Sequence, residues 1–209
     1  MSSIPSYRCK RATDPPALDG GAWDGAETIE AALHLLGKPQ ERSVSHLSLA
    51  AMWDDDALYV SYLSDPSPVP VTMRERDDDL FDECAVEVFL RAGVGYYEIE
   101  INPLGTVLDL HFTEVEVEDW RAMALFNVNG LRWRVGEAGA DGRWWAQVAI
   151  PWNGVPATTR GTCDGEPCVF GNFARSQKLP NGEYDLTSWS PAREAFCEPD
   201  AMGCLILAS

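Results

Sequence analysis

CAVEVFLRAGVGYYEIEIN, residues 84–102, consists of two runs of alternating apolar and polar residues joined by a loop that contains glycine. This alternation predicts a β-hairpin. If Leu90 pairs with Tyr97 in an antiparallel register, Glu87 lies opposite Glu100, with Cβ atoms roughly 5 Å apart. Like charges in such a pair destabilise a sheet, so the pair needs an explanation in solvation or in function. The carboxylates on the outward face of this hairpin are Glu87, Glu98 and Glu100.

From Ser45 onward the chain repeats the same pattern of short β-rich runs closed by turn residues. Aspartates 54–56 suit the first of these turns, and Pro103 and Gly105 suit the turn that follows the hairpin. About ten short strands at this spacing predict an all-β protein, an antiparallel β-sandwich. No repeat or flexible linker divides the sequence, which we expect to form a single domain over residues 1–209.

Two segments depart from the strand pattern. Residues 26–36 have a weak helical period, which predicts a short helix. Residues 64–82, SDPSPVPVTMRERDDDLFD, are rich in proline and then acidic, which predicts a long loop across one edge or mouth of the sandwich. Loops of this length are often functional.

The charge balance excludes several classes of partner. A formal net charge of −17 argues against nucleic acid and anionic membranes, since binding to polyanions depends on lysine and arginine. No apolar run approaches the ~18 residues that a membrane span requires. The first residues, MSSIPSYRCKRATDPPALDG, contain no signal-peptide core, so we expect a cytoplasmic protein; a chain whose signal peptide had been removed would be secreted.

The six cysteines have no metal-ligand spacing of the CxxC kind. Cys163 lies close to Cys168 in the sequence, and Cys197 lies close to Cys204, so disulfides within these pairs are open in an oxidising compartment. The absence of a signal peptide favours reduced thiols.

Seven short motifs resemble, in the same order and over nearly the whole chain, those of the family 9 carbohydrate-binding modules and their stand-alone relatives. The motifs are LDGGAWDGAE, WDDDALYVSYLSDP, DECAVEVFL, YYEIEINPLGTVLDL, WAQVAIPW, GNFAR and WSP. The resemblance implies a β-sandwich that binds a mono- or disaccharide, or the end of a sugar chain, between two aromatic rings on one face. It implies binding without catalysis.

Carried over residue by residue, the resemblance places the two rings at Phe81 and Trp189. Known binders of the family have tryptophan at the first of these positions and a basic residue at the position of Glu100. Carboxylates and amides would form hydrogen bonds with the sugar hydroxyls, because charge-assisted hydrogen bonds are stronger than neutral ones. Arg175 matches the stand-alone relatives, and we expect it to offset the acidic row. The ligand-binding residues implied are Phe81, Glu87, Glu100, Asn102, Arg175 and Trp189.

Other interpretations stay open. Glu87 and Glu100 could lie on a solvated outer face, and Trp189 could belong to the core. A carboxylate pair about 5 Å apart is also what a retaining glycosidase uses, as acid and nucleophile. A structural or haem-binding sandwich, with His111 as a ligand, is a third class, although no CxxCH motif is present.

Metal binding has one candidate in the sequence, the acidic loop. Aspartates 77–79, with Asp65 and Asp82 nearby, have the oxygen ligands that calcium prefers but not the spacing of an EF-hand. A solvated charged loop is the alternative. We therefore predict no required cofactor, with calcium as an option, and a saccharide as the partner; the oligomeric state stays open.

Overall fold

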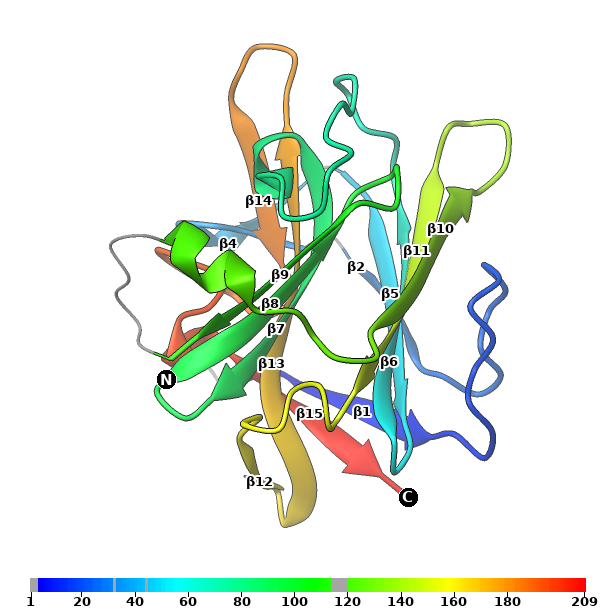
Figure 1. Ribbon diagram of the computed structural model, residues 1–209, viewed down its shortest axis with the longest axis vertical. Helices are drawn as coiled ribbons and strands as arrows, with labels where there is room; N and C mark the ends of the chain where they lie inside the picture. The colour runs from blue at the N-terminus through cyan, green and yellow to red at the C-terminus, as the bar shows by residue number, and fades with distance from the viewer. Residues whose placement is uncertain (1–3, 32, 44, 114–119) are drawn as a thin grey trace.

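The computed structural model describes residues 4–31, 33–43, 45–113 and 120–209. The fold is a β-sandwich, and Figure 1 shows its two layers on either side of the interior. The first layer comprises β2 (Thr28–Ala31), β5 (Leu47–Trp53), β6 (Ala57–Ser64), β10 (Arg132–Glu137) and β11 (Trp144–Pro151). The second comprises β7 (Cys84–Ala92), β8 (Gly95–Ile101), β9 (Val107–Phe112), β12 (Arg160–Cys163), β13 (Glu166–Lys178), β14 (Tyr184–Ser188) and β15 (Gly203–Ala208).

Three further strands lie at the edges: β1 (Ser6–Arg11), β3 (His34–Leu35) and β4 (Lys38–Arg42). β1 links the layers, because it pairs in parallel with β15 and, at its end, with β5. The helical elements of the described chain are the 3-10 turns η1 (Leu80–Asp82), η2 (Trp120–Leu125) and η3 (Pro199–Ala201). Within the described residues, no helix has the length and apolar character needed to cross a membrane.

The predicted antiparallel sandwich is confirmed, and so is the register of its central hairpin. Leu90 pairs with Tyr97 and Glu87 pairs with Glu100. The described residues form 15 strands, more than the expected ten, because short strands also form near the N-terminus and at the edges. The predicted helix over residues 26–36 is wrong, since this segment contributes β2 and β3, and pairing of β2 with β5 overrides the weak local helical period.

The main core lies between the two layers. Strand alternation sends every second side chain inwards. Val88, Ile99 and Phe173 of the second layer belong to the same buried cluster as Leu49 and Val148 of the first. The outward-facing residues of both layers therefore determine what else the sandwich can bind.

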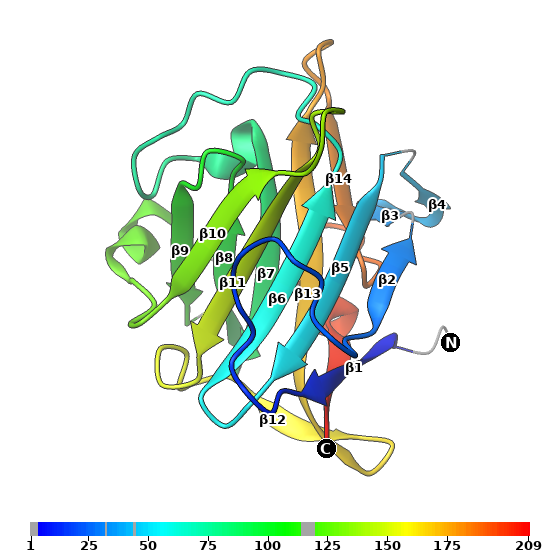
Figure 2. The ribbon, with the colours of Figure 1, turned by 90° about the vertical axis from the view of Figure 1, so that its right-hand side faces the viewer.

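Both outer faces are partly covered. The N-terminal segment crosses the outer face of β6 and β11, as the dark blue trace in Figure 2 shows. Gln147 on β11 holds it, since its side chain accepts a hydrogen bond from the Gly20 amide (3.0 Å) and donates one to the Gly21 carbonyl (2.9 Å). On the second layer, Phe89 and Leu108 are buried together with Leu80 of η1.

Candidate functional site

Three glutamates converge on the outer face of β7 and β8, which we call the acidic face. Residues 98 and 100 are two apart on β8 and share one side, and residue 87 pairs directly with residue 100. One carboxylate oxygen from each of Glu87, Glu98 and Glu100 lies within 4.8 Å of those of the other two. The row predicted from the sequence is therefore a cluster in three dimensions.

The acidic face is buried, so the alternative that Glu87 and Glu100 lie on a solvated outer face is wrong. Glu87 is 2% exposed and Glu100 is 0% exposed, whereas Glu98 is half-buried. η1 and the segment of residues 192–202 cover the face, and they pack into one apolar cluster with Phe89 and Phe112. Local alternation placed the glutamates outward, but they are covered by η1, which directly precedes β7, and by residues 192–202, which are distant in sequence.

Burial changes the protonation of the cluster. Desolvation, together with the charge on Glu98, raises the pKa of Glu87 to about 8, although hydrogen bonds from Ser176 oppose the shift. Desolvation also raises the pKa of Glu98 to about 7. The pKa of Glu100 is raised well above its usual range by desolvation and by the charges on Glu87 and Glu98. Without a counter-charge, the cluster therefore holds protons near neutral pH.

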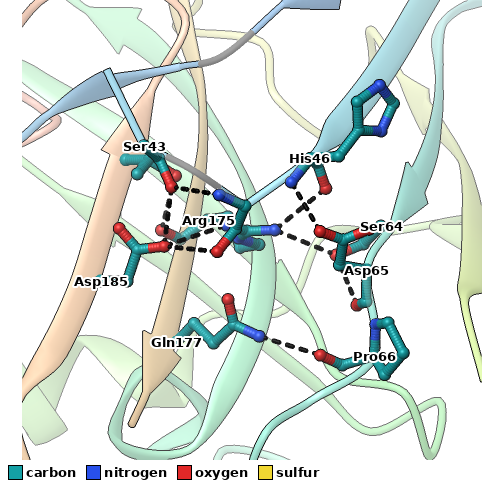
Figure 3. Close-up of polar contacts among 10 residues, drawn as sticks. Ser43, His46, Ser64, Asp65, Pro66, Arg175, Gln177 and Asp185 are labelled. Atoms are coloured by element: carbon teal, nitrogen blue, oxygen red, sulfur yellow. Dashed lines mark hydrogen bonds and ion pairs between the residues drawn. The ribbon is translucent and has the colours of Figure 1, made fainter. Parts of the chain in front are cut away.

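Arg175 does not offset these carboxylates. Its neighbour Ala174 pairs with Glu87 and shares its side of the sheet, so Arg175 points to the opposite side, into the sandwich. Arg175 is completely buried and forms an ion pair with Asp185 at 3.3 Å (Figure 3). It also donates a hydrogen bond to the His46 carbonyl at 3.1 Å. The expectation that Arg175 neutralises the acidic row is thus wrong, because successive side chains of a strand point to opposite faces of the sheet.

The surroundings of Arg175 join the ends of several strands. The Asp185 carboxylate also accepts hydrogen bonds from the Ser43 and Ser45 hydroxyls, at 2.8 and 2.9 Å. Gln177 donates a hydrogen bond to the Pro66 carbonyl at 3.0 Å, as Figure 3 also shows. This network connects β13 and β14 to the chain around β5 and β6, which is a structural role.

Asn102 is buried at the end of β8, where its amide shapes the turn to β9. Its Oδ1 accepts hydrogen bonds from the backbone amides of Leu104 and Thr106, both at 3.0 Å. Its Nδ2 donates to the Met73 carbonyl at 2.8 Å and so also anchors the loop of residues 64–82. All these partners are internal, so Asn102 acts here as a turn residue.

The two predicted rings do not lie together. Trp189 packs against the inter-layer core, with its ring 5.7 Å from that of Phe173 and 6.4 Å from that of Tyr7, centroid to centroid. It also fills the space beside Gly203, where an added Cβ would lie 2.5 Å from the indole. Phe81 is half-buried and packs with the apolar cluster of the acidic face.

Two residues of the acidic face were missing from the predicted site. Glu98 has the same strand parity as Glu100, and this signal was available in the sequence. Phe196 lies in an irregular segment without periodicity, so only the folded chain reveals it. Its ring packs 6.0 Å from that of Phe89, in the same cluster as Phe81.

Residues of the acidic loop, 64–82, form ion pairs that involve arginines. Asp79 pairs with Arg121 at 2.5 Å, and Arg76 pairs with the buried carboxylate of Asp109. The Asp78 carboxylate accepts a hydrogen bond from the Glu75 amide at 2.9 Å. Calcium binding by this loop stays a prediction.

The thiols group differently from their spacing in the sequence. The Cys204 thiol on β15 forms hydrogen bonds with the thiols of Cys163 and Cys168, and burial is the main cause that raises its pKa. Cys197 lies instead beside the Tyr96 hydroxyl. All six cysteines are free thiols.

A separate hollow of about 320 Å³ lies between the N-terminal segment and the first layer. Trp23 and Trp145 are among its walls, and Ser48 and Ser61 line it with hydroxyls. The Trp145 indole packs closely against Gly20 and therefore holds the N-terminal segment as well.

No protein-family model matches the sequence, and a search of curated proteins finds no match. Solved structures do match. A protein from Bacteroides uniformis ATCC 8492, proposed to bind carbohydrate, has a TM-score of 0.70 and 18% identity over 98% of this chain and 99% of its own. A family 9 carbohydrate-binding module from Caldicellulosiruptor kristjanssonii, solved with glucose, has a TM-score of 0.64 and 13% identity over 97% of this chain and 95% of its own.

A second structure of a family 9 module from that organism, in complex with cellotriose, has the same TM-score of 0.64 at 13% identity. It covers 98% of this chain and 94% of its own. These matches extend over nearly the full length of both partners, and the predicted family likeness holds at the level of the fold. The chain has the fold of the family 9 carbohydrate-binding modules.

Proposed function

We propose that this protein binds a saccharide without cleaving it, and that the ligand occupies the acidic face. The observation that carries the proposal is the meeting of aromatic rings and carboxylates on one face: Phe81 and Phe196 pack in the apolar cluster that borders the three glutamates. Phenyl rings can stack on the CH groups of a pyranose, while carboxylates accept hydrogen bonds from its hydroxyl groups. The fold supports this proposal, since two structures that share it contain glucose and cellotriose.

Each predicted site residue has a role in this proposal. Phe81, Glu87 and Glu100 contact the sugar, and Glu98 and Phe196 join them. Asn102 and Arg175 act from outside the site by holding the turn after β8 and the strand β13, and Trp189 supports β14 from the core.

Access to the face requires movement of the covering segment. Phe81 and Glu98 are half-buried, so the ligand meets them first, whereas Phe196 is 7% exposed and belongs to the segment that covers the face. Its backbone is held to β13 by a hydrogen bond of 3.1 Å from the Asn172 side chain to the Phe196 carbonyl. Because only molecules in which this contact is open can bind the ligand, the apparent affinity is reduced in proportion to the fraction of open molecules.

The test is calorimetric titration with glucose, cellobiose and cellotriose, preceded by a glycan array. Binding should fall at least tenfold in Glu87→Gln and in Phe81→Ala. The matched control is Trp23→Ala, which alters the hollow under the N-terminal segment and should leave the affinity unchanged. Loss of binding in Trp23→Ala alone would move the site to that hollow, and no binding of any glycan would overturn the proposal.

A glycosidase is the second candidate, and one observation favours it. Carboxylates of Glu87 and Glu100 lie within 4.8 Å, and a raised pKa keeps one of them protonated near neutral pH, as a general acid requires. Aryl glycosides should release their chromophore if this is correct, and both Glu87→Gln and Glu100→Gln should abolish the release. Saccharide binding without release would leave binding as the sole function.

A further inference from the structure

We propose that Glu87, Glu98 and Glu100 form a binding site for a hard divalent cation of the size of Ca²⁺. The inference concerns the ion alone and does not require that a saccharide binds. It places the cation on the acidic face rather than in the loop of residues 77–79.

The geometry fits a calcium coordination sphere. Ca²⁺ binds 6–8 oxygens at about 2.3–2.6 Å, so ligands on opposite sides of the ion lie about 5 Å apart. The three carboxylates supply up to six oxygens, and the oxygens that converge lie no more than 4.8 Å from one another. Mg²⁺ needs oxygens at about 2.0–2.1 Å in a regular octahedron and releases its water reluctantly, so a covered cluster suits it less well.

Unpaired buried oxygens give a second, independent indication of a ligand. Neither carboxylate oxygen of the completely buried Glu100 has a hydrogen-bond partner of normal geometry among the described residues. Contacts with the Glu98 carboxyl group and with the Phe81 backbone amide also act on the pKa of Glu100, but they rank behind desolvation and the charges on Glu87 and Glu98. Oε1 of Glu87, on a side chain 2% exposed, is also without a partner. Buried carboxylate oxygens without donors are costly, and a cation would satisfy all of them together.

The ion pairs of the protein also leave the cluster without a counter-charge among the described residues. Across the described parts of the chain, none of the ion pairs includes any of the three glutamates. Arg175, the nearest candidate by sequence, faces the opposite side and pairs with Asp185. A divalent cation would reduce the formal charge of the three ionised carboxylates from −3 to −1, which a buried site needs.

Glu98 is the most exposed of the three proposed ligands. Glu98 is half-buried, whereas the other two ligands are covered, so an ion would contact Glu98 first. If the proposed saccharide site is also correct, the sugar hydroxyls could serve as further ligands of the bound ion.

The experiment uses the full chain after treatment with EDTA and dialysis into metal-free buffer. Calcium chloride should raise the melting temperature in a saturable way, by about 5–10 °C at a hundredfold excess over Kd. Calorimetry should give one Ca²⁺ per chain, and magnesium chloride should have a smaller effect at equal concentration.

Variants locate the ion. Glu98→Gln should weaken the calcium response at least tenfold, and Glu100→Gln should abolish it; if Glu100→Gln does not fold, the half-buried Glu98 still decides the question. Asp79→Asn is the control in the acidic loop and should respond like the unmodified protein. A response lost in Asp79→Asn but kept in both glutamate variants, or no saturable response at all, would overturn the proposal.

The cation and the saccharide can be tested apart. Sugar titrations in EDTA and in calcium measure saccharide binding with and without the ion. Calcium binding without any sugar binding would leave the cation site intact and refute the proposed function, whereas sugar binding in EDTA without any calcium response would do the reverse.

Discussion

Glu100 combines features that rarely occur together in a folded protein. It is completely buried, lies opposite Glu87, and has two carboxylate oxygens without a hydrogen-bond partner of normal geometry in the described structure. A buried carboxylate in this state costs several kcal/mol unless a proton or a cation neutralises it. A residue that costs stability in this way is a marker of function rather than of folding, and both proposals above depend on it.

Trp189 offers a prediction at the same scale. Its ring packs against Tyr7 and Phe173 in the core, so Trp189→Ala should lower the free energy of unfolding by about 3 kcal/mol. Urea denaturation measures the change, and Tyr184→Ala, which removes an exposed ring, is the aromatic control and should have a much smaller effect. A fully stable Trp189→Ala protein that has lost saccharide binding would instead return this residue to the ligand site.

At the scale of the element, β13 serves two environments at once. Ala174 and Ser176 lie on the acidic face, paired with Glu87 and Ala85, whereas Phe173 and Arg175 point into the sandwich. The strand thus places Ser176, which forms a hydrogen bond, beside the buried carboxylate of Glu87, and it places the buried guanidinium of Arg175 on the opposite side. Alternation along a single strand keeps the two charges apart, which is why the acidic face has no arginine from β13.

The ion pair between Arg175 and Asp185 joins β13 to β14, and removing one of its partners should be strongly destabilising. Asp185→Asn leaves the buried guanidinium without its carboxylate, and the expected loss is about 3–5 kcal/mol. The exposed pair of Arg8 and Glu166 is the matched control, and Glu166→Gln should change the denaturation midpoint far less. Similar midpoints for the two variants would show that Arg175 is stabilised by its carbonyl partners instead.

At the scale of the whole molecule, the sandwich carries a cover on each outer face. The N-terminal segment lies over the first layer, and η1 with residues 192–202 lies over the second. The two covers differ in what they hide: apolar residues such as Tyr59 and Met52 under the first, and a cluster of carboxylates under the second. Among the described residues, the second cover therefore hides carboxylate oxygens that lack a hydrogen-bond partner.

The stability of the metal-free protein should depend on pH. The pKa of Glu87 is about 8 and that of Glu98 about 7 in the folded protein, against an ordinary value of 4.5. Since the folded state then binds more protons than the unfolded state, this contribution is complete below pH 4.5 and is lost as the pH rises to about 8. Tyr96 and Cys197, which face Glu98, have raised pKa values and stay neutral over this range.

Denaturation of the EDTA-treated protein at pH 5.5 and pH 8 measures this effect, and we expect a loss of a few kcal/mol at the higher pH. The net charge of −17 adds to the loss, because repulsion grows as the carboxylates ionise. Glu87→Gln removes one of the two titrating carboxyl groups and should reduce the difference between the two pH values. An equal difference in the variant would show that Glu87 does not contribute to the effect.

Much of the fold could be predicted from the sequence. The alternation in residues 84–102 predicted the hairpin, its register and the pairing of Glu87 with Glu100, and the turn at Pro103 and Gly105 was recognisable from residue type. These features depend on contacts between residues close in sequence, where strand periodicity and turn chemistry act directly. The short strand β2 was missed, because it forms only by pairing with β5.

The sequence by itself therefore determined an antiparallel sandwich and a row of glutamates on one side of a hairpin. Only the tertiary structure decided that the row is a buried cluster, that Arg175 faces away from it and that Phe196 rather than Trp189 packs in the same apolar cluster as Phe81. The physical reason is distance along the chain. Residues 192–202 of the cover and the strand β13 are far from the hairpin in sequence, and their contacts with it arise from the packing of the whole molecule, which local patterns do not encode.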